Sequence, residues 1–279
     1  MDFFSIRLPS GELIDLTHPV VMGVINITPD SFFSESRIMM IDSVLKKAEQ
    51  FLKEGAVLID VGGFSSRPNA DWISEEEEAK RVFPVIEALK NEFKELVISI
   101  DTFRSGIAKG ALERGVSMVN DISGGKLDSE MFQVLASHKS PYVLMHMRGT
   151  PQNMQELTHY EHFLAEVVQE LQNQVLKARN VGVVDIIIDP GFGFAKTMDQ
   201  NYVLLKNLNY LGILNCPLLV GLSRKSMAYK LLGISPEEAL NATTVLNTLA
   251  LNQGAKILRV HDVKEAKQCI EIWKKTFEA

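Results

Sequence analysis

The chain has 279 residues, a formal net charge of -6, 46% hydrophobic residues and 23% charged residues, which is ordinary for a soluble globular protein with a large core. The acidic balance without a basic stripe argues against a nucleic-acid partner. No apolar run approaches the roughly 20 residues needed to span a bilayer, so no membrane partner is expected. Residues 1–4 lack the basic and then apolar pattern of an export signal, and we expect a cytoplasmic protein. Cys216 and Cys269 have no metal-ligand spacing and are expected to be buried free thiols.

The first predicted element is a short hairpin. Apolar runs at residues 6–8 and 13–16 flank Pro9-Ser10-Gly11-Glu12, a sequence typical of a turn. We expect this hairpin to plug one end of the fold that follows.

From Val20 onward, short apolar runs alternate with longer segments of helical period, which indicates repeated βα units and a parallel sheet. The expected strands cover residues 20–25, 57–61, 97–100, 117–119, 142–145, 185–188, 218–222 and 256–260. The expected helices cover residues 43–53, 75–91, 105–114, 128–137, 160–180, 199–208, 236–252 and 263–277. Ser74 and Glu77 form a capping box, and residues 75–78 are expected to be a solvated first helical turn.

Eight strands, each followed by a helix, predict an α/β fold of the (β/α)8 TIM barrel type. No linker or change in composition divides the chain, so residues 1–279 are expected to form one domain, with residues 1–18 as its hairpin. A doubly wound open sheet is the alternative. It is disfavoured because no first βα turn reads GxGxxG, residues 191–196 carrying Lys196 at the third glycine position, and GxxxxGK[ST] is absent.

The stretch after residues 185–188 carries a carboxylate at a strand end. Pro190 cannot donate to a sheet, and Gly191 and Gly193 tolerate unusual backbone angles, so the chain must turn after Asp189. Such a turn with two phenylalanines would suit a site that holds a flat polar ring. Alternatively, Asp189 caps the next helix and the phenylalanines belong to the core.

Every predicted strand ends in polar residues, and in a barrel these ends meet on one face, where active sites of this fold lie. Asp60 or Asp121 alone would be interpreted as a cap or turn residue. Polar groups at all eight ends are harder to explain in that way and indicate a site. In chain order these residues are Asn26, Asp60, Asp101, Asn120, Asp121, His146, Asp189, Ser223, Arg224, Lys225, Arg259 and His261.

The residue types indicate which ligand they suit. Asp101, Asn120 and Asp189 supply acceptors for the amino and ring N–H groups of a pterin or purine, and Lys225 supplies a donor for the opposite edge. Arg259 offers a planar guanidinium to a ring face or to a phosphate, while Asn26, Arg67 and His261 form a candidate anion pocket. No Ser/His/Asp order, HExxH or cysteine-nucleophile signature is present, which favours catalysis by positioning and charge stabilisation.

Together these motifs closely resemble the dihydropteroate synthase family. The resemblance runs in the family's order from about Val20 to about Asp262 and so covers nearly the whole predicted barrel. The matching segments are Met22-Gly23-Val24-Ile25-Asn26-Ile27-Thr28-Pro29-Asp30-Ser31-Phe32, Asp60-Val61-Gly62-Gly63, Ser65-Ser66-Arg67-Pro68, Ile100-Asp101-Thr102, Asn120-Asp121, Met145-His146-Met147, Asp189-Pro190-Gly191-Phe192-Gly193-Phe194, Ser223-Arg224-Lys225-Ser226 and Arg259-Val260-His261-Asp262.

The resemblance implies condensation of 6-hydroxymethyl-7,8-dihydropterin diphosphate with p-aminobenzoate in folate biosynthesis, with Mg²⁺ as cofactor on the leaving diphosphate and Asn26 as its ligand. It assigns the pterin to Asp101, Asn120, Asp189, Lys225 and Arg259, and the diphosphate to Asn26, Arg259 and His261. It assigns p-aminobenzoate to Phe32, Ser66, Arg67, Pro68, Phe194, Arg224 and Ser226, with its carboxylate near the start of a helix. A homodimer through the late helices and inhibition by sulfonamides are also implied.

Some loop residues depart from the family pattern. Phe64 stands at a position that is usually polar, Ser66 replaces threonine, and Ala242 stands where glycine is expected. The loop at residues 32–37 lacks the usual Asp-Gly-Gly, so any acidic role in it would pass to Glu35 or be lost. Two alternatives therefore remain open at this point: a methyltetrahydrofolate:corrinoid methyltransferase with a similar barrel, and a pterin-binding paralogue without turnover.

Overall fold

The structure is a computed structural model that describes residues 4–27, 34–64 and 72–277, with the backbone alone for residues 34–38. Phe32, Ser66, Arg67 and Pro68 lie outside the described residues, as does the side chain of Glu35. None of the helices in the described ranges is both long enough and apolar enough to cross a membrane.

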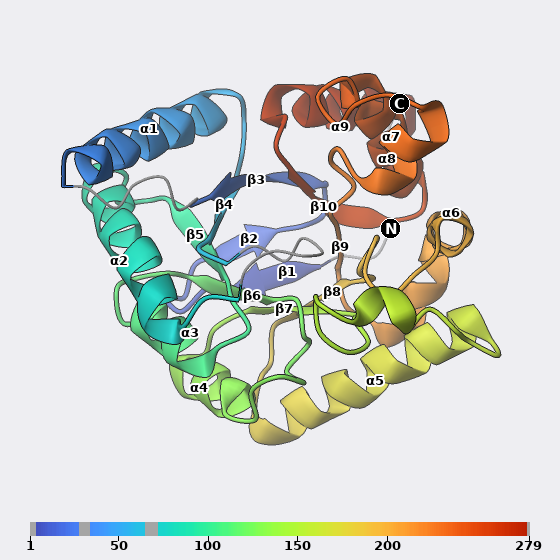
Figure 1. Ribbon diagram of the computed structural model, residues 1–279, viewed down its shortest axis with the longest axis horizontal. Helices are drawn as coiled ribbons and strands as arrows, with labels where there is room; N and C mark the ends of the chain where they lie inside the picture. Colours follow the sequence, from blue (N-terminus) through green and yellow to red (C-terminus); the bar gives the residue numbers. More distant parts are fainter. Residues whose placement is uncertain (1–3, 28–33, 65–71, 278–279) are drawn as a thin grey trace.

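Eight parallel strands close into a barrel in the order β10-β3-β4-β5-β6-β7-β8-β9, so the predicted α/β barrel is confirmed. Figure 1 shows the helices forming a ring around these strands. The strands are β3 (Val20–Asn26), β4 (Leu58–Gly62), β5 (Val97–Asp101), β6 (Met118–Asp121), β7 (Tyr142–Met145), β8 (Ile186–Asp189), β9 (Leu218–Val220) and β10 (Ala255–Val260).

The N-terminal hairpin closes the barrel at the amino ends of its strands, as predicted. Strands β1 (Ser5–Arg7) and β2 (Leu13–Asp15) pair antiparallel, and in Figure 1 they lie across the middle of the ring. The hairpin's buried side chains share one apolar cluster with one inward-facing residue from every barrel strand. That cluster comprises Ile6, Leu8, Ile14, Leu16, Met22, Leu58, Val97, Met118, Val143, Ile187, Leu219 and Ile257.

The barrel residues alternate between two environments because successive side chains of a strand point to opposite faces. In β4, for example, Ile59 and Val61 belong to the large core between strands and helices, whereas Leu58 belongs to the cluster under the hairpin. Inward-facing residues two positions beyond that cluster form the next layer toward the carboxyl ends of the strands. This alternation determines which polar residues can face the barrel mouth.

The helices follow the predicted order, with differences mainly at their ends. They are α1 (Ser34–Lys53), α2 (Glu75–Glu92), α3 (Ser105–Leu112), α4 (Met131–His138), α5 (Phe163–Val181), α6 (Met198–Lys206), α7 (Ser226–Leu232), α8 (Leu240–Asn252) and α9 (Val263–Phe277), with 3-10 turns η1 (Met154–Glu156) and η2 (Leu208–Leu214). The hydrophobic pattern did not predict α7, because its seven residues are too few for a clear helical period, although the family resemblance implied a helix start near Ser226.

The first turn of α2 differs from the prediction that it is wholly solvated. Ser74 does cap this helix, accepting a hydrogen bond from the Glu77 backbone N–H at 3.1 Å. Glu78, however, is completely buried and forms an ion pair with Arg104. Burial raises the pKa of the Glu78 carboxyl, and hydrogen bonds from Thr102 and Arg104 oppose that shift. One of the four acidic residues therefore has a structural role that its position in a charged run concealed.

Candidate active site

The polar floor of the barrel mouth lies directly above the apolar layer. Asp60, Asn120, Asp189 and Arg259 each stand two residues after a member of that layer, so strand alternation turns all four inward. Asn120 Nδ2 donates to Asp60 Oδ2 at 2.9 Å, and Arg259 Nε donates to the same oxygen at 2.7 Å. Asp60 is thus part of the site, although taken singly it would have been interpreted as a cap or turn residue.

Arg259 is held between two carboxylates. Its Nη2 donates to Asp101 Oδ2 at 2.6 Å, while its Nε contacts Asp60. The two contacts fix the plane of the guanidinium, and its pKa is raised because the neighbouring Asp60 and Asp101 outweigh the effect of burial. Burial raises the pKa of Asp101 to about 7, against the opposing effect of Arg259. The two carboxylates therefore hold the guanidinium in a fixed orientation at the mouth, with 21% of the Arg259 side chain exposed.

Asp189 and Lys225 face each other across the same floor. Asp189 is buried, and its Oδ1 accepts a hydrogen bond from the Gly191 N–H at 2.7 Å. Burial raises the pKa of Asp189, while Lys225 and Arg259 act in the opposite direction. Burial also lowers the pKa of Lys225 to about 8. An acceptor and a donor on one floor suit the two edges of a flat heterocycle.

The turn after β8 brings two aromatic residues beside Lys225. Its Nζ donates to the Phe192 carbonyl and lies 4.6 Å from the centre of the Phe194 ring. The Phe192 side chain is buried in the large core, whereas Phe194 is partly buried and lines the upper cluster near Phe103. Of the two roles considered from the sequence, packing therefore applies to Phe192, while Phe194 borders the mouth.

Gly191 is required by close backbone approach. Its φ is +70°, and a Cβ at this position would lie 2.0 Å from the His146 carbonyl oxygen. A side chain would therefore collide with the end of β7 and displace the turn. The sequence predicted that the turn after Asp189 needs unusual backbone angles, and this close approach is the steric reason.

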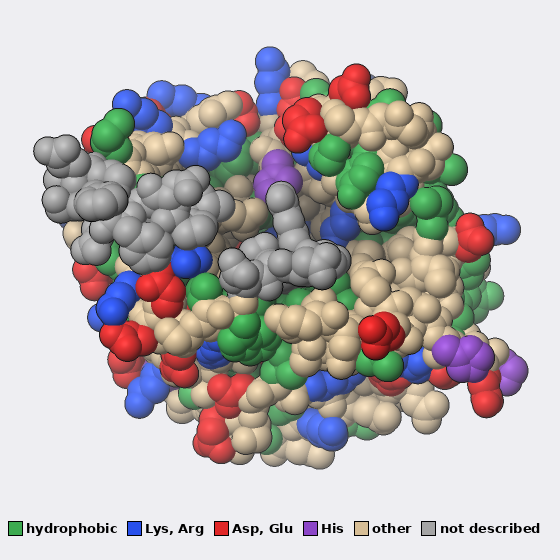
Figure 2. All heavy atoms as spheres, in the orientation of Figure 1, with side chains coloured by type: hydrophobic (Ala, Val, Ile, Leu, Met, Phe, Trp, Pro, Cys, Tyr) green, Lys and Arg blue, Asp and Glu red, His purple; other side chains and the backbone are tan. Residues whose placement is uncertain are grey.

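The remaining predicted anion-binding residues come from two edges of the mouth. Asn26 is exposed at the end of β3, and the His261 N–H donates to Ser223 Oγ at 3.3 Å after β10. Arg224 has a φ of +52° and forms a two-bond contact with Asp262, with both N···O distances 2.9 Å. Ser226 is the first residue of α7. Figure 2 shows a hollow near the centre of this face with histidine and basic side chains at its edge.

Two of the polar strand-end residues point away from the mouth. Asp121 accepts hydrogen bonds from the Ser123 and Gly125 N–H groups at 2.7 and 2.9 Å and from the Tyr142 hydroxyl at 2.8 Å. It is a turn residue, as its type alone suggested. His146 is buried between β7 and α5, because it follows the inward-facing Met145. The expectation that all eight ends converge is therefore wrong for these two side chains.

Phe64, a departure from the family pattern, packs at the base of the loop between β4 and α2. Its ring centre lies 5.3 Å from that of Trp72 and 5.2 Å from that of Phe103. Arg104 lies over these rings and donates to the Ile73 carbonyl at 2.5 Å. An aromatic and cationic cluster therefore replaces a polar residue at this position.

Comparison with known proteins agrees with this geometry. Residues 22–261 match the model of the family described as pterin binding enzyme. A dihydropteroate synthase from Synechocystis sp. is 44% identical over 276 residues, covering 97% of this chain and 95% of that protein. The Yersinia pestis dihydropteroate synthase in complex with a sulfonamide drug is 37% identical, with a TM-score of 0.91 and 100% of each chain covered. The Thermus thermophilus enzyme in complex with 4-aminobenzoate is 32% identical, with a TM-score of 0.88, covering 98% of this chain and 100% of that one.

The closed barrel, its polar floor and the family match define a pterin-binding enzyme, and the chain belongs to that family. Its full-length similarity places it among the dihydropteroate synthases, which are transferases of folate biosynthesis.

Proposed function

We propose that the chain transfers the pterinylmethyl group of 6-hydroxymethyl-7,8-dihydropterin diphosphate to p-aminobenzoate. The observation that carries this proposal is the acceptor-and-donor floor formed by Asp189, Asn120 and Lys225 beside the fixed guanidinium of Arg259. Asp189, Asn120 and Asp101 would accept from the amino and ring N–H groups of the pterin. Lys225 would donate to the opposite edge, and Arg259 would lie on the ring face and reach the diphosphate.

The transfer needs no covalent enzyme intermediate. The arylamine nitrogen forms a bond to the methylene carbon, the C–O bond to the diphosphate breaks, and the diphosphate leaves with the electron pair. The amine then loses one proton to water. The electron-rich pterin can stabilise a cation-like methylene during this displacement. The chain's contribution is to hold the two reactants in line and to neutralise the leaving group, which are the larger sources of catalysis when no strong base takes part.

The diphosphate would be held by Asn26, Arg259 and His261 together with Mg²⁺. Within the described ranges, no group of three His, Cys, Asp or Glu side chains could hold a metal ion by itself. The donor set fits Mg²⁺ shared with a diphosphate, because this ion commonly takes one or two protein oxygens plus substrate phosphates. A Cβ at Gly62 would lie 3.7 Å from Asn26 Oδ1, so the missing side chain leaves that oxygen accessible. When bound, Mg²⁺ would neutralise charge on the leaving group.

The p-aminobenzoate would lie against Phe194, with Phe32, Ser66, Arg67 and Pro68 as its other wall. Its carboxylate would approach Ser226 at the start of α7. Arg224 would act there indirectly, because its guanidinium is already bonded to Asp262 and to the Pro236 and Glu237 carbonyls. The 4-aminobenzoate complex of the Thermus thermophilus relative supports this assignment of substrate.

A diphosphate-release assay tests the proposed reaction. The protein is incubated with the pterin diphosphate, p-aminobenzoate and Mg²⁺, and release is compared with a reaction that lacks p-aminobenzoate. We expect release that depends on both substrates. Pterin binding without release would instead favour a paralogue without turnover. Methyl transfer from methyltetrahydrofolate to a corrinoid would favour the methyltransferase alternative.

We also propose a cytoplasmic homodimer formed through the late helices. Val245 and Leu249 on α8 and Ile272 and Phe277 on α9 are exposed apolar side chains. A groove of about 310 Å³ lies between these two helices. Light scattering on the purified protein is expected to give twice the mass of the 31.2 kDa chain.

A further inference from the structure

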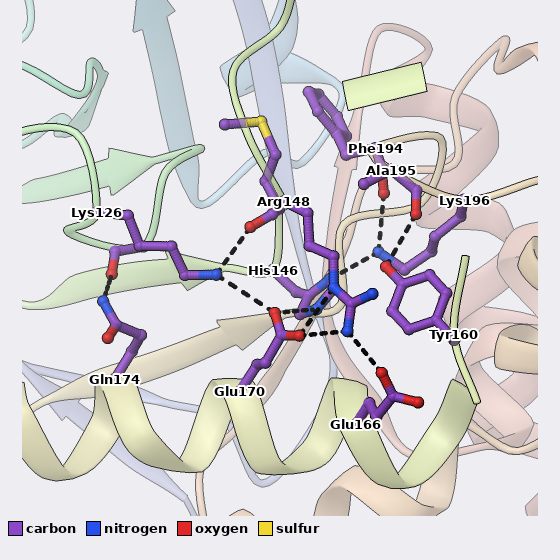
Figure 3. Close-up of polar contacts among 12 residues, drawn as sticks. Lys126, His146, Arg148, Tyr160, Glu166, Glu170, Gln174, Phe194, Ala195 and Lys196 are labelled. Carbon is purple, nitrogen blue, oxygen red and sulfur yellow. Dashed lines mark hydrogen bonds and ion pairs between the residues drawn. The ribbon is translucent and has the colours of Figure 1, made fainter. Parts of the chain in front are cut away.

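A buried polar network lies beneath the turn after β8, on the side that faces α5. Figure 3 shows Lys196, His146 and Glu170 pointing toward one another from the turn, from the end of β7 and from α5. Lys196 is 3% exposed and His146 is 1% exposed. None of these three residues belongs to the floor that faces the substrates.

Lys196 has a matched set of acceptors. Its Nζ lies 3.0 Å from the Gly191 carbonyl, 3.0 Å from the Phe194 carbonyl and 2.9 Å from His146 Nδ1. An ammonium group has three N–H donors, so each acceptor receives one. Burial lowers the pKa of Lys196 to about 7, because a buried cation is costly even when it is hydrogen-bonded, so this three-donor arrangement belongs to the protonated form. The arrangement therefore depends on both carbonyls and on an unprotonated Nδ1.

His146 supplies that unprotonated nitrogen. Burial lowers its pKa to about 3, and the adjacent Lys196 acts in the same direction, so the imidazole is neutral. A neutral ring that accepts at Nδ1 carries its proton on Nε2. Nε2 lies 3.2 Å from Glu170 Oε2. The geometry is too poorly aligned for a hydrogen bond, but the negative charge of the carboxylate lies next to the Nε2 proton. Arg148 in turn holds Glu170 Oε1 at 2.6 Å. The carboxylate thus favours the tautomer that Lys196 requires.

The two carbonyls that Lys196 holds flank the substrate-facing part of the turn. Asp189 accepts from the Gly191 N–H, so the position of Gly191 sets the orientation of the Asp189 carboxylate. Phe194 presents its ring below Lys225, and Lys225 holds the Phe192 carbonyl from the other side. Two lysines therefore hold successive parts of one turn, Lys225 from the mouth and Lys196 from beneath.

We propose that Lys196, oriented by His146 and Glu170, is a positioning residue that sets the turn carrying Asp189 and Phe194 for both substrates. This role rests on the proposed function, because Asp189 and Phe194 are assigned there to the pterin and to p-aminobenzoate. Supporting groups that fix a substrate-binding residue affect turnover strongly even when they touch no substrate.

Replacement of Lys196 by Met tests the role directly, since Met keeps an unbranched side chain out to the ε position and removes the donors at Nζ. For folded K196M we expect KM for p-aminobenzoate and Kd for the pterin both to rise, with kcat/KM falling on the order of ten- to a hundredfold. Folding is checked by circular dichroism and by a melting temperature above that of the assay. Folded K196M with wild-type KM and Kd values would overturn the proposal.

Two variants at His146 give an independent test if K196M does not fold. The amide oxygen of Asn can take the place of Nδ1, whereas the amide of Gln reaches the place of Nε2. We expect H146N to keep both constants within about threefold of wild type and H146Q to shift them toward the K196M values. Equal effects of the two variants would contradict the role of the Lys196 contact.

Lys126 provides the matched control within the same network. It donates to the Met147 carbonyl at 2.8 Å and lies 3.5 Å from Glu170, but none of its described contacts is with the turn. K126M is expected to keep wild-type KM and kcat. A loss in K126M equal to that in K196M would show a general packing effect and overturn the proposal. A wild-type protein that releases no diphosphate would instead count against the proposed function, while pterin Kd values would still report on Lys196.

Discussion

At the scale of single residues, the site depends on charges that are buried but paired. Arg259 lies between Asp60 and Asp101, and Lys225 lies near Asp189 and under the influence of Arg259. Removing one member of such a set leaves its partners buried without compensation, which costs more than the contact itself contributes. Substitutions here are therefore expected to affect ligand binding strongly.

Lys225→Ala removes the donor assigned to the pterin edge. Because a buried acceptor on the ring would lose a charged partner, we expect a loss on the order of 1 to 3 kcal/mol of binding free energy, or about ten- to a hundredfold in Kd. Calorimetric titration with the pterin measures it. Lys230→Ala is the matched control, since Lys230 lies on the neighbouring α7 and is exposed. Pterin affinity that is equal in the two variants would refute the assignment of Lys225.

The lowered pKa of Lys225 predicts a pH dependence. Burial lowers this pKa to about 8 from an ordinary value of 10.5, so the ammonium is lost as the pH rises past about 8, and pterin affinity should fall there. The sign for stability is opposite. Between about 8 and 10.5 the unfolded state binds more protons than the folded state, so the contribution of Lys225 to the free energy of unfolding rises with pH.

Because pterin affinity and folding stability change in opposite directions with pH, the two effects can be measured separately. Kd for the pterin and the free energy of unfolding in urea are measured at the same series of pH values. Weaker binding without loss of stability is expected in wild type. The weak binding of K225M should not decline over this range, because Met does not titrate. A decline of equal steepness in K225M would assign the effect to another group.

At the scale of elements, strand alternation decides which residues reach the mouth. The sequence allowed the strands and their polar ends to be predicted, because apolar runs and turn residues are local signals. The local pattern did not show which of these polar side chains point into the barrel mouth. Asp60 was counted among the polar strand ends but was given no ligand role, although it lies two residues after the inward-facing Leu58. His146 was expected at the mouth, although it follows the inward-facing Met145 and lies against α5.

Contacts between distant elements could not be predicted in this way. Lys196 and Glu170 carry no motif that links them to His146, and only folding brings α5 beneath the turn after β8. The role of Glu78 was missed for a similar reason, because its partner Arg104 lies beyond another strand. Resemblance to a family proposed the residues that contact the substrates, but it did not indicate this supporting layer.

The hairpin closes the barrel at the amino ends of its strands, and its contribution to stability can be tested. Leu16 is fully buried among the inward-facing residues at the amino ends of the strands. Leu16→Ala is expected to lower the free energy of unfolding by about 2 to 5 kcal/mol, because it leaves a cavity in a closed apolar layer. Urea denaturation measures the change. Leu13→Ala is the control, since Leu13 lies in the same hairpin and is 55% exposed. Equal losses of unfolding free energy in the two variants would contradict the role of the hairpin in closing the barrel.

The same pair of variants separates the two ends of the barrel. The hairpin lies at the amino ends of the strands, whereas the polar floor lies toward their carboxyl ends. Folded Leu16→Ala protein should therefore keep wild-type KM values in the diphosphate-release assay. A raised KM would mean that the apolar layer transmits strain to the floor above it.

At the scale of the whole molecule, the polar floor assigned to the substrates is built from parts of the chain that are far apart in sequence. Asp60, Asn120, Asp189 and Arg259 come from four different strands, and barrel closure brings them into one layer. No single βα unit contains a complete pocket. Inhibitor competition therefore reports on the assembled site rather than on any one loop.

Sulfonamides are expected to compete with p-aminobenzoate and not with the pterin. They share its flat arylamine, so they should occupy the slot bordered by Phe194 while the pterin floor at Asp189 and Lys225 stays available. Because an arylamine sulfonamide can itself release diphosphate, formation of dihydropteroate is measured instead, and the apparent KM for p-aminobenzoate should rise with inhibitor concentration at constant kcat. A sulfonamide that lacks the para-amino group is the control: without the shared arylamine it should compete much more weakly, and it has no nucleophile that could release diphosphate. Competition against the pterin diphosphate would place the inhibitor on the floor instead, and a fall in kcat at constant KM would place it outside both substrate sites.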